Sequence, residues 1–512
     1  MPAGRLRNSA SVVLWRRRQA DQALQVFWVQ RSPQLRFMGG WHAFPGGALD
    51  PEDPATELDG NPSMSSEEGD RFGPHQVPGL AAAALRELFE ETGVLPTADF
   101  GPKLGERLRK GLSAARHQLL DHGGSLSAAL QGLGVQPRAT ELVFAGRWRT
   151  PPQTPVRFDN RFFLLHWPSS APLQPEILPG ELVSGEWITP QEALDAWRHG
   201  RVITAPPILH ILRVLASHGP EEGLPQLRSA DGQRLGSFRR FEFRPGVITL
   251  PLITPTLPPA AHTNAFLLGH GETVLVDPGS SLPEQQEALL EALEEAAFQG
   301  RAPRAIWLTH HHPDHIGAVA TVRRAFGLPV LAHPATAQRL LAHGITVDDV
   351  LEAGQTHHLQ GEPSMEVRVL HTPGHAPGHL CFFDAQTGSL LAGDLVAGLG
   401  TIVIDPPDGE MAHYLESLQA IADLDPLVLF PAHGPPLHDG RRQLLKLLKH
   451  RRQRERRIQQ AHAAGHTTLD ALLPEVYPDL DPLAAPLARR QILAHLLHLG
   501  LAPDDSNDSG TT

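Results

Sequence analysis

Residues 309–317, with the sequence Thr-His-His-His-Pro-Asp-His-Ile-Gly, decide how this chain can be interpreted. They follow an apolar run that is typical of a buried strand. His310 and His312 are two positions apart, so on extended backbone they face the same side, and Asp314 and His315 follow within one turn. Imidazole nitrogens and carboxylate oxygens at this density suit Zn²⁺ or a similar transition ion. A solvated His-rich loop is the alternative, and more distant residues weigh against it.

Short apolar runs recur between residues 241 and 440, with helical patterns between them, which predicts a β-rich α/β layering. Five of these runs end in polar clusters, and one shared site at one edge of packed sheets explains all five. The runs are Val247–Ile253, Ala265–Leu268, Thr273–Asp277, Ala305–Leu308, Val367–Leu370, Ser389–Ala392 and Val428–Phe430. The clusters are Asp277-Pro278-Gly279, His310–His315, His371–His375, Gly393-Asp394 and Ala432-His433-Gly434.

These residues resemble the metallo-β-lactamase superfamily, whose motif His-x-His-x-Asp-His is followed by later His, Asp and His ligands. The resemblance implies an αββα sandwich over residues 241–440 that holds two Zn²⁺ ions. It implies that His310, His312 and His375 hold the first ion, that Asp314, His315 and His433 hold the second, and that Asp394 bridges them. Asp277 is expected to orient a ligand from behind. His311, His371 and His379 are expected to bind no metal, and Cys381 to be a core residue.

Two metal ions roughly 3.5–4 Å apart can share a hydroxide, lower its pKa and polarise the electrophile that it attacks. Hydrolysis is therefore the expected chemistry, and Asp314 is also a candidate catalytic residue that orients the attacking water. The site alone leaves thioesters, phosphodiesters and lactams open as substrates.

A second acidic cluster lies on a predicted helix over residues 80–94, which Ala and Leu favour and Gly93 ends. Glu87, Glu90 and Glu91 are spaced i, i+3, i+4 and so share one helical face. Mg²⁺ or Mn²⁺ would relieve their repulsion and would in turn bind phosphates. A solvated acidic face is the alternative, against which the preceding Gly46-Gly47 turn argues.

The run 86–94, Arg-Glu-Leu-Phe-Glu-Glu-Thr-Gly-Val, resembles the second half of the Nudix hydrolase box. The first half is interrupted: counting from Gly46 puts Glu52 at its acidic position, and counting from Gly47 puts Asp53 there. The resemblance implies an α/β/α sandwich over residues 1–217. It also implies that Glu87, Glu90 and Glu91 hold Mg²⁺ or Mn²⁺, that Glu87 and Glu90 are catalytic, and that Arg86 pairs with an acidic group. Residues 147–152 and 157–163 resemble the subgroup that cleaves coenzyme A and acyl-coenzyme A, which implies nucleoside-diphosphate-linked small-molecule substrates.

Residues 441–458 form a strongly basic helical pattern, which on charge alone is most simply a solvated face and alternatively binds a phosphate backbone. The metal motif followed by this helix resembles the β-lactamase-like protein 2 branch. That resemblance implies a winged-helix-like domain over 441–503 and single-stranded RNA as a possible substrate. Residues 218–240 are predicted as a linker, and 504–512 as a disordered tail.

At 512 residues the chain is too long for one ordinary core. It has no apolar run that could span a bilayer, and its basic start lacks a secretory signal, so we expect a cytoplasmic protein with no membrane partner. Its single cysteine excludes an internal disulfide, and a net charge of −12 gives no general attraction to nucleic acid. The combined prediction is an α/β bifunctional metal-dependent hydrolase. A non-catalytic Nudix ligand sensor and a metal-dependent RNA endonuclease are the alternatives for its two halves.

Overall fold

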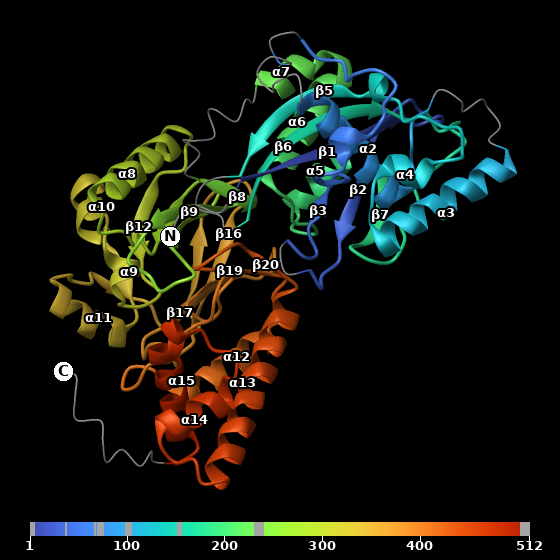
Figure 1. The fold of residues 1–512 in the computed structure, drawn as a ribbon. Helices are drawn as coiled ribbons and strands as arrows, with labels where there is room; N and C mark the ends of the chain where they lie inside the picture. Colours follow the sequence, from blue (N-terminus) through green and yellow to red (C-terminus); the bar gives the residue numbers. More distant parts are fainter. Residues whose placement is uncertain are drawn as a thin grey trace. The chain divides into compact units, whose positions relative to one another are not determined.

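The computed structural model of the chain divides into two compact units, Met1–Phe238 and Arg239–Thr512 (Figure 1). Residues 218–229, predicted as linker, are mostly helical, in α6 (Pro206–Glu222) and α7 (Leu224–Ser229). The rest of that predicted linker up to 239, and the predicted disordered tail, lie outside the described residues. The described residues are 6–35, 38–65, 68, 76–97, 105–150, 156–229 and 240–501.

The first unit is built on a seven-stranded sheet with β1 (Leu6–Arg17) at its centre. β1 pairs in parallel with β6 (Arg157–His166) and antiparallel with β2 (Leu24–Arg31). Alternate residues of a strand point to opposite faces, and here both faces of β1 are buried. The remaining strands are β3 (His42–Ala43), β4 (Gly46–Ala48), β5 (Val143–Arg149) and β7 (Leu182–Ile188).

Helices cover both faces of this sheet, as the predicted α/β/α sandwich requires. Val12 and Leu14 pack into a core cluster that contains the apolar side of α2 (Gln76–Thr92). Val13 packs into the opposite cluster, formed with α5 (Pro190–Arg198) and α6. The other helices on the α2 side are α3 (Glu106–His122) and α4 (Leu126–Leu130).

Helix α2 confirms the helix predicted from residue 80, although it begins four residues earlier. It ends before Gly93, whose positive φ of 72° suits glycine. Asp53, the acidic position counted from Gly47, lies in the short 3-10 helix η1 (Asp53–Ala55) with 2% of its surface exposed.

The second unit contains two sheets, and every apolar run predicted there forms a strand. The seven-stranded sheet contains β8 (Phe241–Arg244), β9 (Val247–Ile253), β10 (His262–Leu268), β11 (Thr273–Val276), β12 (Pro303–Trp307), β13 (Val330–Ala332) and β14 (Asp349–Val350). The six-stranded sheet contains β15 (Thr356–Leu359), β16 (Met365–His371), β17 (Leu380–Asp384), β18 (Ser389–Gly393), β19 (Val428–Pro431) and β20 (Leu437–His438).

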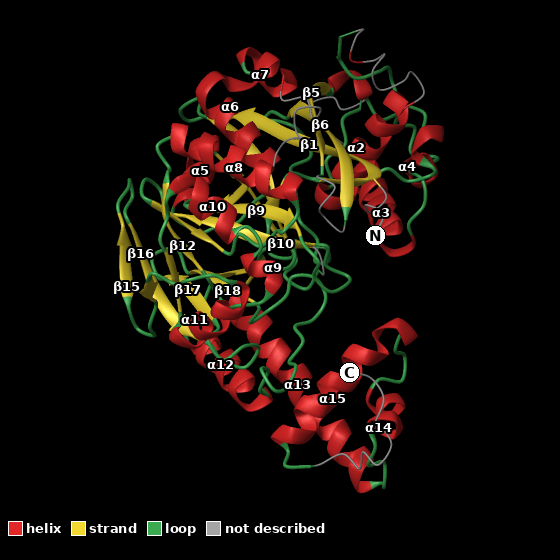
Figure 2. Cartoon of the chain, turned by 90° about the vertical axis from the view of Figure 1, so that its left-hand side faces the viewer, coloured by secondary structure: helices red, strands yellow, loops and turns green. Residues whose placement is uncertain are grey.

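Aromatic rings join the inner faces of the two sheets. Trp307 of β12 meets Phe382 of β17 with ring centroids 5.1 Å apart. Helices α8 (Pro283–Phe298) and α10 (Val319–Phe326) cover the outer face of the first sheet, and α12 (Met411–Asp423) covers that of the second (Figure 2). This arrangement is the predicted αββα sandwich.

Three helices follow the sandwich: α13 (Gly440–Ala463), α14 (Leu469–Val476) and α15 (Ala485–His498). Leu444 and Leu448 of α13 belong to the same core cluster as α12, whereas the far end of α13 packs with α14 and α15 in a cluster of its own. Residues 440–501 contain no strand, so the predicted appendage is helical but lacks the wing that the winged-helix resemblance implied. No helix in the described part of the chain is long and apolar enough to cross a membrane.

Gly279 provides a test of how tightly the loops at the sheet edge are packed. A Cβ at this position would lie 1.9 Å from the carbonyl oxygen of Asp314. Gly279→Ala should therefore lower the free energy of unfolding by about 1–3 kcal/mol through overpacking and also lower the bound-metal content. Gly344→Ala is the control. Its φ of 70° strains an alanine backbone, but no atom lies within 4 Å of the would-be Cβ, so this variant should lose stability without losing bound metal. Urea unfolding and elemental analysis of both variants measure this, and equal metal content in the two would contradict it.

Candidate metal centre

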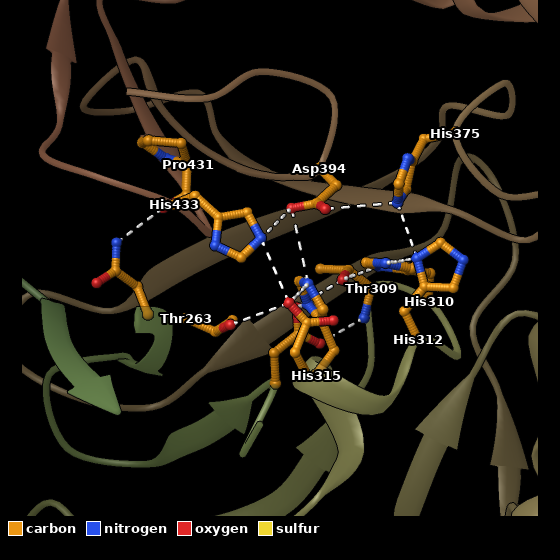
Figure 3. A network of polar contacts seen from close by, with 12 residues as sticks. Thr263, Thr309, His310, His312, His315, His375, Asp394, Pro431 and His433 are labelled. Atoms are coloured by element: carbon orange, nitrogen blue, oxygen red, sulfur yellow. Dashed lines mark hydrogen bonds and ion pairs between the residues drawn. The ribbon is translucent and has the colours of Figure 1, made fainter. Parts of the chain in front are cut away.

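Three imidazoles of the second unit converge on one point, as the sequence predicted (Figure 3). The Nδ1 atom of His312 lies 3.0 Å from Nε2 of His310 and 2.9 Å from Nε2 of His375. Tetrahedral ligands about 2.1 Å from a Zn²⁺ ion would be about 3.4 Å apart, so these three nitrogens are close to the spacing of a first ligand set.

Asp314, His315 and His433 form a second group, and Asp394 lies between the two groups. The Asp394 Oδ2 atom is 3.4 Å from His375 Nε2 in the first group. Its Oδ1 atom is 3.3 Å from His433 Nε2 and 3.6 Å from His315 Nε2 in the second. One oxygen therefore faces each group, which is the arrangement that a bridging carboxylate needs.

Backbone carbonyls fix the outward nitrogens of two of these imidazoles. The Nδ1 atom of His375 is 2.8 Å from the Val403 carbonyl oxygen, and that of His433 is 3.0 Å from the His262 carbonyl oxygen. A carbonyl can only accept, so each Nδ1 carries a proton and each Nε2 faces the site. Metal-binding histidines are commonly oriented in this way.

Asp277 orients the other side of the site, where the sequence expected it. Its Oδ1 accepts a hydrogen bond of 2.8 Å from the Thr309 N–H, and its Oδ2 accepts one of 2.5 Å from the Thr309 hydroxyl. The same Oδ2 is 2.8 Å from His315 Nδ1, and the Thr309 hydroxyl is 3.0 Å from His310 Nδ1. One buried carboxylate thus fixes an imidazole in each group.

Two buried inward atoms, His315 Nε2 and Asp394 Oδ1, make the ion-pair contacts given above but no hydrogen bond within the described part of the chain. Burying a polar atom without a partner is costly, and a cation would remove that cost. The donors are imidazole nitrogens and carboxylate oxygens, which is a set that Zn²⁺ accepts. The residues therefore fit a pair of such ions.

Burial disfavours a charged imidazole in both groups, but the neighbouring charges act on the histidine pKa values in opposite directions. In the first, burial and the surrounding imidazoles lower the pKa of His312 to about 2 and that of His310 well below its usual range, so both are neutral and ready to bind metal. In the second, burial also disfavours a charged His315, but nearby carboxylates, with Asp314 foremost, outweigh it and raise its pKa to about 10. The pKa of His433 is raised as well, because Asp394 outweighs the effect of its burial.

Two histidines expected to bind no metal have defined contacts. His379 is buried and its Nε2 accepts a 2.9 Å hydrogen bond from the N–H of Asp394, so it positions the bridging residue. His311 is 8% exposed and lies 2.9 Å from Asp408, which also pairs with Arg339. The Asp408 partner had no signal in the sequence because it lies 97 positions further on.

Cys381 is buried in β17, which confirms it as a core residue, and burial raises its pKa to about 12.

In the first unit, Arg86 is buried and joins the predicted acidic residues. It donates to Asp53 at 2.9 Å, to Glu87 at 3.0 Å and to Glu90 at 3.2 Å. The interrupted motif allowed either Glu52 or Asp53 at its acidic position. The structure shows that Asp53 pairs with Arg86, whereas Glu52 is exposed.

Glu87, Glu90 and Glu91 share a face of α2, but their carboxylate oxygens do not all lie within 4.8 Å of one another, as they do in the clusters of the second unit. Glu91 accepts a 2.9 Å hydrogen bond from the N–H of Gly46. Burial raises the pKa of Glu87 to about 7, with the charge of Glu90 adding to the effect, and burial also raises the pKa values of Glu90 and Glu91. This face would therefore bind protons or a cation near neutral pH.

A family model described as the Metallo-beta-lactamase superfamily matches residues 258–433. This part of the chain is a metallo-β-lactamase superfamily domain. The lactamase-like protein aptB of Emericella nidulans is 31% identical over 39% of this chain and 59% of its own length. An atrochrysone carboxyl ACP thioesterase of Aspergillus fumigatus is 26% identical over 69% of this chain and 84% of its own length.

The chain spans less than two thirds of the length of several of these relatives, including 57% of the lactamase-like protein adaB of Aspergillus niger. Among solved structures, a NUDIX hydrolase from Alicyclobacillus acidocaldarius is 29% identical, with 44% of this chain and 98% of that chain covered and a TM-score of 0.36.

The opposite protonation of the two ligand groups predicts different pH dependences for two Zn²⁺ equivalents. The first site needs no deprotonation at pH 7, whereas binding at the second must displace the proton of His315, whose pKa of about 10 lies above the working pH. The second affinity should therefore fall by about tenfold for each pH unit lowered, and the first should change little. Calorimetry in buffers of different ionisation enthalpy measures the protons released, and equal release at both steps would contradict the assignment.

Proposed function

We propose that the metallo-β-lactamase domain is a dinuclear Zn²⁺-dependent hydrolase of acyl thioesters. The observation that carries the proposal is the position of Asp394, with one oxygen toward each of two groups of imidazoles. These imidazoles are either neutral or carry a proton that a metal ion can displace. The names of relatives as ACP thioesterases favour a thioester over a phosphodiester or a lactam.

In this reaction the oxygen of water bonds to the acyl carbon, the carbon–sulfur bond breaks, and the sulfur leaves as a thiol after taking up a proton. Two bound ions would supply an activated nucleophile at neutral pH and polarise the acyl oxygen. Asp314 is suited to orient the attacking water, because the Thr263 hydroxyl donates to its Oδ2 at 3.3 Å and 17% of its side-chain surface stays exposed. His379 keeps Asp394 in place through its backbone N–H.

The basic helix α13 keeps the RNA endonuclease alternative open, because Arg441, Arg442, Lys446 and Lys449 are exposed on it. Arg451, another cationic residue of this helix, is fully buried. Arg454 lies over the ring of Tyr477, 4.3 Å from its centroid. The exposed cations of α13, rather than Arg451, are therefore the ones that a phosphate backbone would contact.

We also infer that the first unit is a Nudix diphosphatase that uses Mg²⁺ or Mn²⁺, with coenzyme A or acyl-coenzyme A as the favoured substrates. The pairing of buried Arg86 with Asp53, Glu87 and Glu90 supports this proposal. Because Arg86 fixes Glu87 and Glu90, these two are the catalytic candidates, and Glu91 is the third candidate ligand. Acyl-coenzyme A contains both a thioester and a pyrophosphate linkage, so one compound could serve both units.

Thioester hydrolysis should depend on the metal centre of the second unit and not on the acidic face of α2 in the first unit. His312→Ala should reduce release of free thiol from an acyl thioester to the background rate, because it removes the nitrogen on which His310 and His375 converge. His343→Ala, at an exposed histidine of the same domain, and Glu90→Gln should leave the rate unchanged. A thiol-trapping assay measures the rate. Cleavage of single-stranded RNA by the wild type, with no thiol release, would contradict the thioesterase proposal.

Pyrophosphate cleavage should show the opposite dependence. Glu90→Gln should abolish Mg²⁺-dependent release of phosphorylated products from coenzyme A, because it removes a charged oxygen ligand. Glu106→Gln, at an exposed glutamate of α3, and His312→Ala should retain the activity. Product analysis by chromatography measures this. Wild-type protein that binds coenzyme A without turnover would instead identify the unit as a ligand sensor.

A further inference from the structure

Three consecutive backbone carbonyls, at residues 402–404, are each held by a different side chain. The middle one is the acceptor for Nδ1 of the candidate ligand His375. The carbonyls on either side accept hydrogen bonds from residues of the C-terminal helices, which lie beyond the matched superfamily region. The contacts are Arg451 to Ile402 at 2.7 Å, His375 to Val403 at 2.8 Å and Gln491 to Ile404 at 3.2 Å.

Arg451 of α13 and Gln491 of α15 act as one unit. The guanidinium of Arg451 donates to the Oε1 atom of Gln491, whose amide nitrogen then donates to the carbonyl of Ile404. Both side chains are buried, and the guanidinium lies over the ring of Tyr414, 5.2 Å from its centroid. No carboxylate of the described residues forms an ion pair with Arg451. Burying a cation in this way is costly, which argues that its contacts serve more than packing.

Two further contacts hold backbone close to the candidate metal ligands. Arg490 of α15 pairs with Asp405, the residue that follows the held segment. The Tyr414 hydroxyl donates at 2.8 Å to the carbonyl of Leu395, which is next to the candidate bridging residue Asp394. The helical appendage therefore holds the backbone that contacts His375, and its Arg451 lies over the α12 tyrosine that holds the backbone next to Asp394.

We propose that Arg451 and Gln491 are positioning residues for the metal centre. They fix the 402–404 segment so that the Val403 carbonyl holds His375 with its Nδ1 protonated and its Nε2 directed at the first metal. Because the direct partner of His375 is a backbone carbonyl, side chains that anchor this backbone are the means by which the sequence can set its position. This inference rests on the proposed metal-binding role of His375.

A purely structural role would lower the stability of the folded chain without changing the affinity of the folded protein for Zn²⁺. The test therefore measures Zn²⁺ affinity on the full chain by competition with a chromophoric chelator, alongside the folded fraction from circular dichroism. Gln491→Met keeps the approximate volume but removes both polar atoms. Arg451→Lys keeps the charge in case Arg451→Met does not fold, and Arg452→Met at the exposed neighbour is the control.

We expect Gln491→Met to weaken the tighter Zn²⁺ site by about tenfold, as loss of ligand-orienting contacts does elsewhere, with Arg451→Lys intermediate and Arg452→Met unchanged. In a His375→Ala background, Gln491→Met should have no further effect. Unchanged affinity in folded Gln491→Met, or the same loss in the His375→Ala background, would overturn the positioning role while leaving the proposed hydrolase intact. Wild-type protein that binds no Zn²⁺ would overturn both.

Discussion

The second unit depends on one electrostatic constraint: inward lone pairs of imidazoles and carboxylates are gathered where little water reaches them. His310 and His312 respond by staying neutral, whereas His315 holds a proton among carboxylates. Such a cluster is stable only if each ring is fixed from outside and if positive charge is supplied inside. Asp277, His379 and two backbone carbonyls hold the rings and Asp394 in place, and a pair of cations would supply the charge.

The first unit meets a related problem with a different solution. Glu87 and Glu90 would repel each other on one face of α2, and the buried guanidinium of Arg86 lies against both. Arg86 is itself balanced by Asp53, so part of the positive charge is built into the chain. The raised pKa values of the glutamates show that this compensation is incomplete, which leaves a role for an added cation.

Much of this could be predicted from the sequence, because strand runs followed by polar clusters have a local pattern. The strands of the second unit and the convergence of His310, His375 and Asp394 follow from that pattern. Three features could not be predicted in the same way. The choice of Asp53 over Glu52 depends on packing across an interrupted motif. The Val403 carbonyl that contacts His375 belongs to the backbone, so no residue type in the sequence indicates it. Arg451 cannot be distinguished from its exposed neighbours by charge alone.

The burial of Cys381 has a consequence for the chemistry proposed here. A thioester hydrolase generates free thiols, and such products readily exchange with accessible protein sulfur once oxidised. The one sulfhydryl of this chain lies in the core with its ionisation suppressed, and the candidate ligands are nitrogen and oxygen atoms only. The catalytic apparatus is thus chemically separate from the redox state of its own products, and peroxide or alkylating agents would have no sulfur ligand to attack.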